Sequence, residues 1–162
     1  MTDFSSLRAL TSELNAAMYN WSEAGVRTAL NAIMARDAIV HMCHPFGDTT
    51  GDQYYDTILA QLHLALPDVE RRPWIVMAGV DEHGFDWIGV AGTYLGTFVR
   101  PFLDIQPTGH LAHMRFHEYF RIEEGQIIEV QAIWDIPELM MQAGAWPMAP
   151  SLGREGLIPG PA

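Results

Sequence analysis

The segment HLAHMRFHEYFRI, from His110 to Ile122, holds three of the seven histidines in the chain. Histidine serves as a metal ligand and as a base that titrates near neutral pH. Side chains alternate between the two faces of a β-strand. This alternation places His113 and His117 on one polar face together with Arg115 and Arg121. Arginines on that face disfavour a cation, so we predict no metal site there.

Glu118 is the exception on the opposite face of the same segment. Its neighbours on that face are Met114, Phe116, Phe120 and Ile122, which predict a buried position. A carboxylate among such side chains is unfavourable unless it is protonated, paired or used in chemistry. Burial raises the pKa of a carboxyl, which suits a general acid or a donor to an oxyanion. The alternative is a structural pair with a buried Arg, Tyr or His, and the sequence leaves both open.

The elements that must position Glu118 follow an α+β order. Helical periodicity is seen in 4–21, 26–36 and 52–66. One β-rich run, 37–43, precedes the third helix, and four follow it at 73–80, 85–99, 112–122 and 126–136. A last helix is expected over 137–144. This order predicts helices on one face of a strongly curved antiparallel sheet, closed into a cone with an apolar interior, as in a cystatin-like α+β barrel.

Domain organisation and composition are simple. We expect one domain over 1–146 and a Pro/Gly-rich tail over 147–162. The net charge of −11, with only nine Lys and Arg, argues against nucleic acid and anionic membranes as partners. A single cysteine, no signal-peptide pattern and no apolar run of about 20 residues favour a cytoplasmic protein.

Several motifs in order resemble the SnoaL-like polyketide cyclases of the nuclear transport factor 2-like superfamily. They are HPFG, GTYLGTF, PTG, FRIEEGQIIE and WDIPELMMQAG, and the resemblance runs from about residue 10 to 146. It implies a cone with an internal pocket for a small hydrophobic molecule, no cofactor, and a homodimer or homotetramer. The implied chemistry is proton abstraction and donation on a polyketide ester, which closes a ring by aldol condensation.

The resemblance assigns roles to individual residues. The usual acid/base aspartate of the family corresponds to Ala132, whereas Glu118 and Asp135 match positions that carry polar groups in relatives. Ketosteroid isomerases, of the same superfamily, have an aspartate base at the position of His44, and their oxyanion acid matches Glu118. Their oxyanion tyrosine corresponds to Met18, next to Tyr19.

We therefore expect His44 to act as a base and Glu118, kept protonated, as a donor to an enolate oxygen. A loop histidine bonded to the backbone is the alternative for His44. The implied pocket has ten further lining residues: Met18, Tyr19, Trp21, Tyr55, Met114, Phe116, Val130, Ala132, Trp134 and Asp135. The expected function is cofactor-independent cyclase or isomerase chemistry on a hydrophobic carbonyl compound. The alternatives are a non-catalytic binding or dimerisation module and a hydrolase or dehydratase of the same fold.

Overall fold

The computed structural model describes residues 4–149, which begin with two short helices, α1 (Phe4–Ala9) and α2 (Ser12–Tyr19). The prediction of one helix over 4–21 was wrong. The hydroxyls of Thr11 and Ser12 bond to the carbonyls of Arg8 and Ala9, at 3.3 and 2.7 Å. Such local side-chain bonds compete with helix continuation, and the chain turns between α1 and α2.

The helical layer continues with α3 (Glu23–Ile33), a π-helical turn η1 (Tyr55–Leu59) and α4 (Ala60–Ala65). Ser22 caps α3 by accepting a hydrogen bond from the backbone N–H of Gly25, at 3.2 Å. Helix α3 ends at Ile33, three residues before the predicted end at residue 36. The first strand begins at the next residue, Met34.

The sheet has six strands: β1 (Met34–Met42), β2 (Asp48–Thr50), β3 (Glu70–Val80), β4 (Asp86–Thr97), β5 (Leu111–Glu123) and β6 (Gln126–Trp134). Their order is β2-β1-β6-β5-β4-β3. All neighbouring pairs are antiparallel except β1 and β6, which run parallel. The expected antiparallel sheet is therefore a mixed one, because the chain returns β6 to the side of β1 after passing through helices and four other strands.

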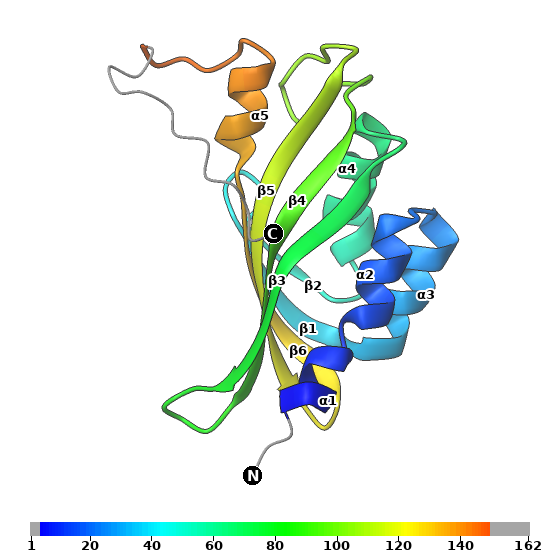
Figure 1. Cartoon of the computed structure of the whole chain (residues 1–162), viewed down its shortest axis with the longest axis vertical. Helices are drawn as coiled ribbons and strands as arrows, with labels where there is room; N and C mark the ends of the chain where they lie inside the picture. The colour runs from blue at the N-terminus through cyan, green and yellow to red at the C-terminus, as the bar shows by residue number, and fades with distance from the viewer. Residues whose placement is uncertain (1–3, 150–162) are drawn as a thin grey trace.

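The sheet is strongly curved and open, and the helices α1 to α4 lie on one side of it (Figure 1). The last helix, α5 (Ile136–Gln142), lies on the opposite side at one end (Figure 1). Burial along β5 alternates as expected, so the prediction that its even-numbered residues face the core is confirmed. His113 and His117 are on the exposed face.

The core lies between the helices and the inner face of the sheet. Its largest fully buried side chains include Trp134, Arg71, Tyr94 and Phe116. No described helix has the length and apolar character needed to cross a membrane. Most of the tail expected over 147–162 lies outside the described residues.

Candidate functional site

Glu118 lies at the centre of a polar cluster inside the apolar core. Its side chain is only 2% exposed. One carboxylate oxygen, Oε1, accepts hydrogen bonds from the hydroxyl of Tyr94 at 3.0 Å and from Nε1 of Trp134 at 2.9 Å. The other, Oε2, lies 2.9 Å from Nη1 of Arg71. Both oxygens of the buried carboxylate are thus engaged by donors.

Arg71 is the cation of this cluster, and its guanidinium is fully buried. Its Nη1 also donates to the hydroxyl of Tyr94 at 2.6 Å, and its Nε donates to Oδ1 of Asn15 at 2.9 Å. The guanidinium carbon lies 4.0 Å from the centre of the Phe116 ring. Its third nitrogen, Nη2, has no hydrogen-bond partner among the described residues.

Strand register brings these side chains together. Arg71 on β3 pairs with Tyr94 on β4, and Glu118 on β5 pairs with Ala132 on β6. Residues directly opposite in neighbouring strands have their side chains on the same face. Ala132 is small, and the side chain that contacts Glu118 from β6 is the indole of Trp134, two residues further along that strand.

In the cluster the Tyr94 hydroxyl is protonated and the Arg71 guanidinium is charged. Burial raises the pKa of Tyr94 well above its ordinary value, so this phenol is a neutral donor to Glu118. Burial is the largest single influence on the pKa of Arg71 and lowers it, but the charge and hydrogen bond of Glu118, together with the neighbouring tyrosines, raise the pKa overall. The Arg71–Glu118 ion pair has no net charge, and the Tyr94 hydroxyl bridges it by accepting from Arg71 and donating to Glu118.

This geometry corresponds to the paired alternative for Glu118. A carboxylate that accepts hydrogen bonds from Trp134 and Tyr94 and contacts the Arg71 guanidinium is stabilised in its ionised form. The expected protonated donor would have to give up at least one of these contacts. The structure therefore shows Glu118 as a hydrogen-bond acceptor at this position.

His44 lies outside the cluster. It is exposed in the loop between β1 and β2. Two residues later, Phe46 turns inward, and its ring lies 5.8 Å from that of Trp134 and 6.0 Å from that of Phe102. The apolar ring thus occupies the position next to the core, while the imidazole remains at the surface. The structure does not bring His44 and Glu118 together.

The expected pocket residues divide into two groups. Tyr19 is 45% exposed, and Asp135 caps α5 by accepting a hydrogen bond from the backbone N–H of Glu138. Asp135 also accepts one from Arg115, on the outer face of the sheet. Trp21 is half-buried and stacks on His63. The other seven are buried in the core: Met18, Tyr55, Met114, Phe116, Val130, Ala132 and Trp134.

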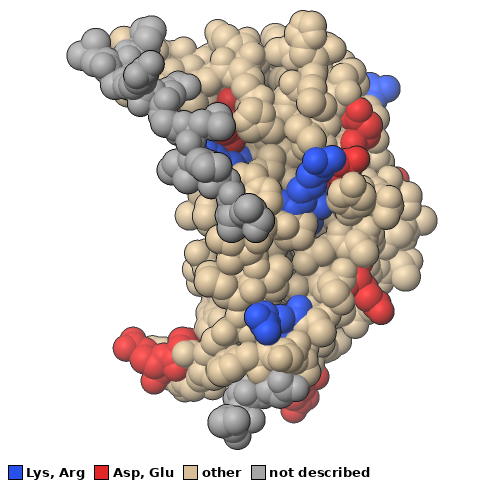
Figure 2. All heavy atoms as spheres, viewed as in Figure 1, with Lys and Arg blue, Asp and Glu red and all other residues tan. Residues whose placement is uncertain are grey.

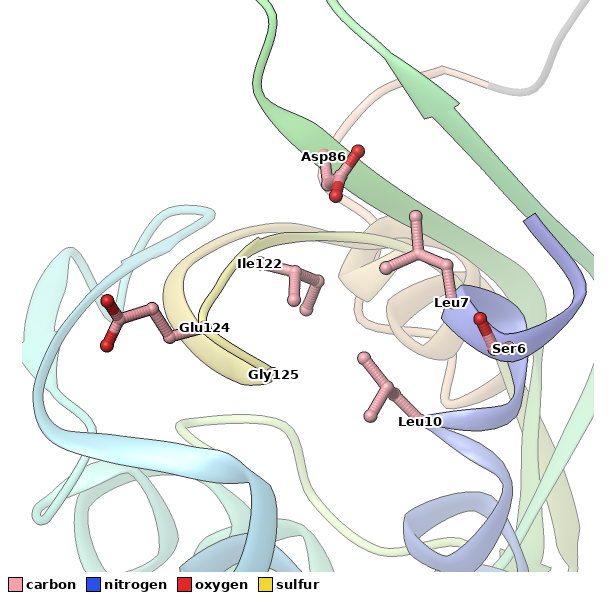
Figure 3. Close-up of a pocket in the computed structure, with 7 residues that line it drawn as sticks. All are labelled: Ser6, Leu7, Leu10, Asp86, Ile122, Glu124 and Gly125. Atoms are coloured by element: carbon pink, nitrogen blue, oxygen red, sulfur yellow. The ribbon is translucent and has the colours of Figure 1, made fainter. Parts of the chain in front are cut away.

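Two hollows on the described surface lie away from this cluster. The smaller, about 260 Å³, is bordered by Leu7, Leu10 and Ile122, with the carboxylates of Asp86 and Glu124 at its edge (Figure 3). The larger, about 560 Å³, is lined by residues of the outer sheet face and the β3–β4 hairpin, including Trp87 and Tyr119. Neither contains an expected pocket residue.

Arg71, Tyr94 and Asn15 are cluster members that are not among the site residues predicted from the sequence. A signal for Arg71 was present: adjacent arginines at 71 and 72 in a strand must point to opposite faces, so one of them points inward. Within the described residues, no group of three or more His, Cys, Asp and Glu side chains could hold a metal ion.

Comparison with known proteins supports the architecture. AclR from Streptomyces galilaeus, a proposed hydroxylase, superposes with a TM-score of 0.72 at 20% identity, covering 93% of this chain and 88% of that one. IdmH from Streptomyces antibioticus, a proposed polyketide cyclase, gives 0.68 at 19% identity, covering 83% and 96%. TsrD from Streptomyces laurentii gives 0.69 at 19% identity, covering 90% and 99%. These identities establish a shared fold. A search of curated protein sequences finds no match.

The solved structures show only the fold, whereas a family model identifies the family. The model of the SnoaL-like polyketide cyclases matches residues 12–143, which contain α2 to α5, the whole sheet and every member of the polar cluster. The chain therefore belongs to the SnoaL-like polyketide cyclase family.

Proposed function

We propose that the protein performs cofactor-independent acid/base chemistry, of cyclase or isomerase type, on a small hydrophobic carbonyl compound. The observation that carries this proposal is the buried carboxylate of Glu118, held by Arg71, Tyr94 and Trp134 inside an otherwise apolar core. Isolated ionisable groups at such depth are unfavourable, and clusters of them are common at functional sites.

Glu118 is the proposed base. It removes a proton from the carbon next to a substrate carbonyl: the C–H bond breaks, an O–H bond forms on Glu118, and the electron pair moves onto the carbonyl oxygen as an enolate. Arg71 then loses its partner charge on Glu118 while a new negative charge forms on the substrate. A guanidinium beside both positions keeps the buried charge compensated before and after the transfer.

Access to the cluster requires side chains to move, since Glu118 is 2% exposed and Arg71 is fully buried. Phe46 and Trp21 are the half-buried rings nearest to it, packed against Trp134 and Tyr94 respectively. We propose that a hydrophobic substrate displaces one of them. Aromatic contacts of this kind are replaceable by an apolar ligand that buries a comparable area.

A non-catalytic binding module is the second candidate, and the engagement of Glu118 favours it, because three donors already contact its oxygens. The motif resemblance also places Ala132 where the family has its usual acid/base aspartate. Relatives of this fold carry different proposed activities, a hydroxylase for AclR and a cyclase for IdmH. Fold alone therefore does not fix the chemistry.

Deuterium exchange separates the two candidates. The protein is incubated in D₂O with 2-tetralone, 1-indanone and 2-acetylnaphthalene, and loss of the proton signal next to the carbonyl is followed by NMR. Catalysis predicts exchange of at least one ketone faster than in buffer with bovine serum albumin at equal concentration. Stabilisation of the protein by a ketone in a thermal-shift assay, with exchange at the control rate for all three, would identify a binding module instead.

A homodimer in the cytoplasm is part of the proposal. The outer face of the sheet exposes the apolar side chains of Ile75, Met77, Leu111 and Ile133. Figure 2, in the view of Figure 1, looks at the sheet from its β3 edge, and charged side chains are few on this side of the molecule. Exposed apolar faces favour association. Light scattering with size-exclusion chromatography tests it: a mass twice that of the 18.1 kDa chain is expected, and a monomer would contradict it.

A further inference from the structure

The larger hollow lies on the outer face of the sheet, beside the β3–β4 hairpin, and the proposed function does not use it. Its volume is about 560 Å³. The residues that line it come from β3, β4, β5, β6 and the hairpin: Gly79, Val80, Asp81, Trp87, Tyr119 and Gln131. This lining contains two aromatic side chains and one carboxylate, and neither Lys nor Arg belongs to it. The hollow therefore combines aromatic surface with a single negative charge.

Gly79 keeps the hollow open. Its backbone φ is not positive, and a Cβ there would meet nothing within 4 Å, so neither conformation nor crowding requires glycine at this position. Glycine inside a strand weakens the strand, and it often marks a place where a ligand approaches. Gly79 is paired with Trp87 across β3 and β4, so the missing side chain leaves the space beside the indole uncovered.

Asp81 fixes both the charge and the indole at the edge of the hollow. Its Oδ1 accepts hydrogen bonds from the backbone N–H groups of His83 and Phe85, each at 2.9 Å. Its Oδ2 accepts one from Nε1 of Trp87 at 3.0 Å. The bond from the Phe85 backbone is the main cause of the lowered pKa of Asp81, so the carboxylate is ionised at neutral pH. Since its N–H is already engaged, Trp87 presents to a ligand only its ring.

The charges around the hollow favour a cation. The three donors to Asp81 are neutral groups, so they leave its charge uncompensated. Arg121 lies opposite Trp87 on β5, but its Nε is 2.8 Å from a carboxylate oxygen of Glu129. The guanidinium of Arg121 also lies 5.0 Å from the centre of the Phe85 ring, so an aromatic side chain of this hairpin already contacts a cation. Acidic side chains gather at the hairpin, at the lower left of Figure 2.

We propose that this hollow binds an organic cation with a methylated ammonium group, held against the ring of Trp87 beside Gly79, with Asp81 as its counter-charge. Tryptophan is the aromatic side chain that attracts a cation most strongly. A primary ammonium needs acceptors for three N–H groups, whereas both oxygens of Asp81 already accept hydrogen bonds. A quaternary ammonium has no N–H to satisfy. The site is separate from the Glu118 cluster and does not depend on the chemistry proposed there.

Three ligands of nearly equal shape and different charge test the site. Choline is a cation, 3,3-dimethylbutan-1-ol is its neutral analogue, and 3,3-dimethylbutanoate is the anion. Each is titrated into the full chain at neutral pH, and the indole N–H signal of Trp87 is followed by ¹H–¹⁵N NMR. The signal is identified by its loss in Trp87→Phe. We expect choline to bind about fivefold tighter than the alcohol, and the anion to bind more weakly than both.

Two variants separate the shape of the hollow from its charge. Gly79→Val places a side chain in open space beside Trp87, so it should fold normally and lower the affinity for choline by about tenfold or more. Asp81→Asn keeps an acceptor for the hairpin and removes the charge, and it should abolish the preference for choline over the alcohol. Ile133→Val, at an exposed position of the outer face that does not line the hollow, is the control and should change neither.

Several results would overturn the site. Equal affinities for choline and the alcohol would show an apolar hollow without cation recognition. Unchanged binding of choline by Gly79→Val, with folding verified by circular dichroism, would place the ligand elsewhere. A Trp87 signal that shifts with protein concentration, and with none of the three ligands, would show that a second copy of the chain covers the hollow.

Discussion

Nη1 of Arg71 lies 2.9 Å from Oε2 of Glu118, and both side chains are almost completely removed from solvent. An ion pair at this depth contributes little net stability, because desolvation of both charges offsets their attraction. Burial also means that each charge is compensated by the other, so removal of either one leaves an uncompensated charge in the core. The position of this pair, between helices and sheet in a family of small-molecule enzymes, is why we assign it a functional role.

Removal of one charge should be strongly destabilising. Glu118→Gln leaves the Arg71 guanidinium buried without its counter-charge, and we expect the free energy of unfolding to fall by about 3 kcal/mol. Urea denaturation followed by tryptophan fluorescence measures the change. Glu123→Gln, an exposed position on the same strand, is the control and should change it by less than about 0.5 kcal/mol. Equal effects of the two variants would show that the pair is not buried.

Replacement of both charges should restore much of that loss. Arg71→Met combined with Glu118→Leu fills similar volume with apolar side chains and removes both desolvation penalties. The double variant should be at least about 1 kcal/mol more stable than either single variant, Arg71→Met or Glu118→Leu. A double-mutant cycle from urea denaturation gives the coupling energy. Additive losses would contradict a direct interaction between the two side chains.

The hydroxyl of Tyr94 should matter more than that of an exposed tyrosine. Tyr94→Phe takes away a donor to Glu118 and an acceptor for Arg71, and we expect a loss of about 1–3 kcal/mol. Tyr119→Phe, on the outer face and 42% exposed, is the matched control and should be nearly neutral. Thermal unfolding monitored by circular dichroism compares them. A neutral Tyr94→Phe would mean that the phenol is not part of the network.

Gly92 should tolerate no side chain. A Cβ there would lie 2.3 Å from the backbone oxygen of Arg72 and 2.7 Å from Cζ of Phe116, the ring under the Arg71 guanidinium. Gly92→Ala should therefore destabilise the protein by about 1–3 kcal/mol. At Gly79 a Cβ would meet nothing within 4 Å, so Gly79→Ala should be tolerated. Similar unfolding midpoints for the two variants in guanidinium chloride would contradict the close contact at Gly92.

Acid should weaken the fold partly through Asp68. Its carboxylate accepts hydrogen bonds from the hydroxyl and the backbone N–H of Thr97, each at 2.6 Å, and these hold the pKa of Asp68 below its ordinary value. A lowered folded-state pKa contributes stability above the unfolded-state pKa, and this is lost as pH falls through the folded-state value. Asp68→Asn should therefore reduce the loss of unfolding free energy between about pH 5 and about pH 3. The exposed Asp104→Asn serves as control, and an unchanged pH dependence in Asp68→Asn would contradict the assignment.

The sequence predicts those parts of the fold that depend on local patterns. Alternation along β5 identified Glu118 as an inward carboxylate, and helical periodicity located the segments that form the helices. It could not supply the partners of Glu118. Arg71 and Tyr94 lie 47 and 24 residues away in sequence and meet Glu118 only through the register of three strands. The parallel pairing of β1 with β6 is equally non-local.

His44 shows the limit of transferring a role by motif. The motif HPFG was found where expected, after the first strand, but the ring that turns inward belongs to Phe46. Whether an imidazole in a loop points to the core depends on the packing of its neighbours, which no short motif encodes.

The dependence of catalysis on Glu118 tests the central claim most directly. Deuterium exchange of the most reactive ketone is compared among the wild type, Glu118→Gln and Glu123→Gln, at a temperature where circular dichroism shows all three to be folded. We predict that Glu118→Gln lowers the enzyme-dependent rate by about 100-fold or more, since an amide cannot accept the proton, and that Glu123→Gln leaves it unchanged. Exchange by folded Glu118→Gln at the wild-type rate would contradict the account.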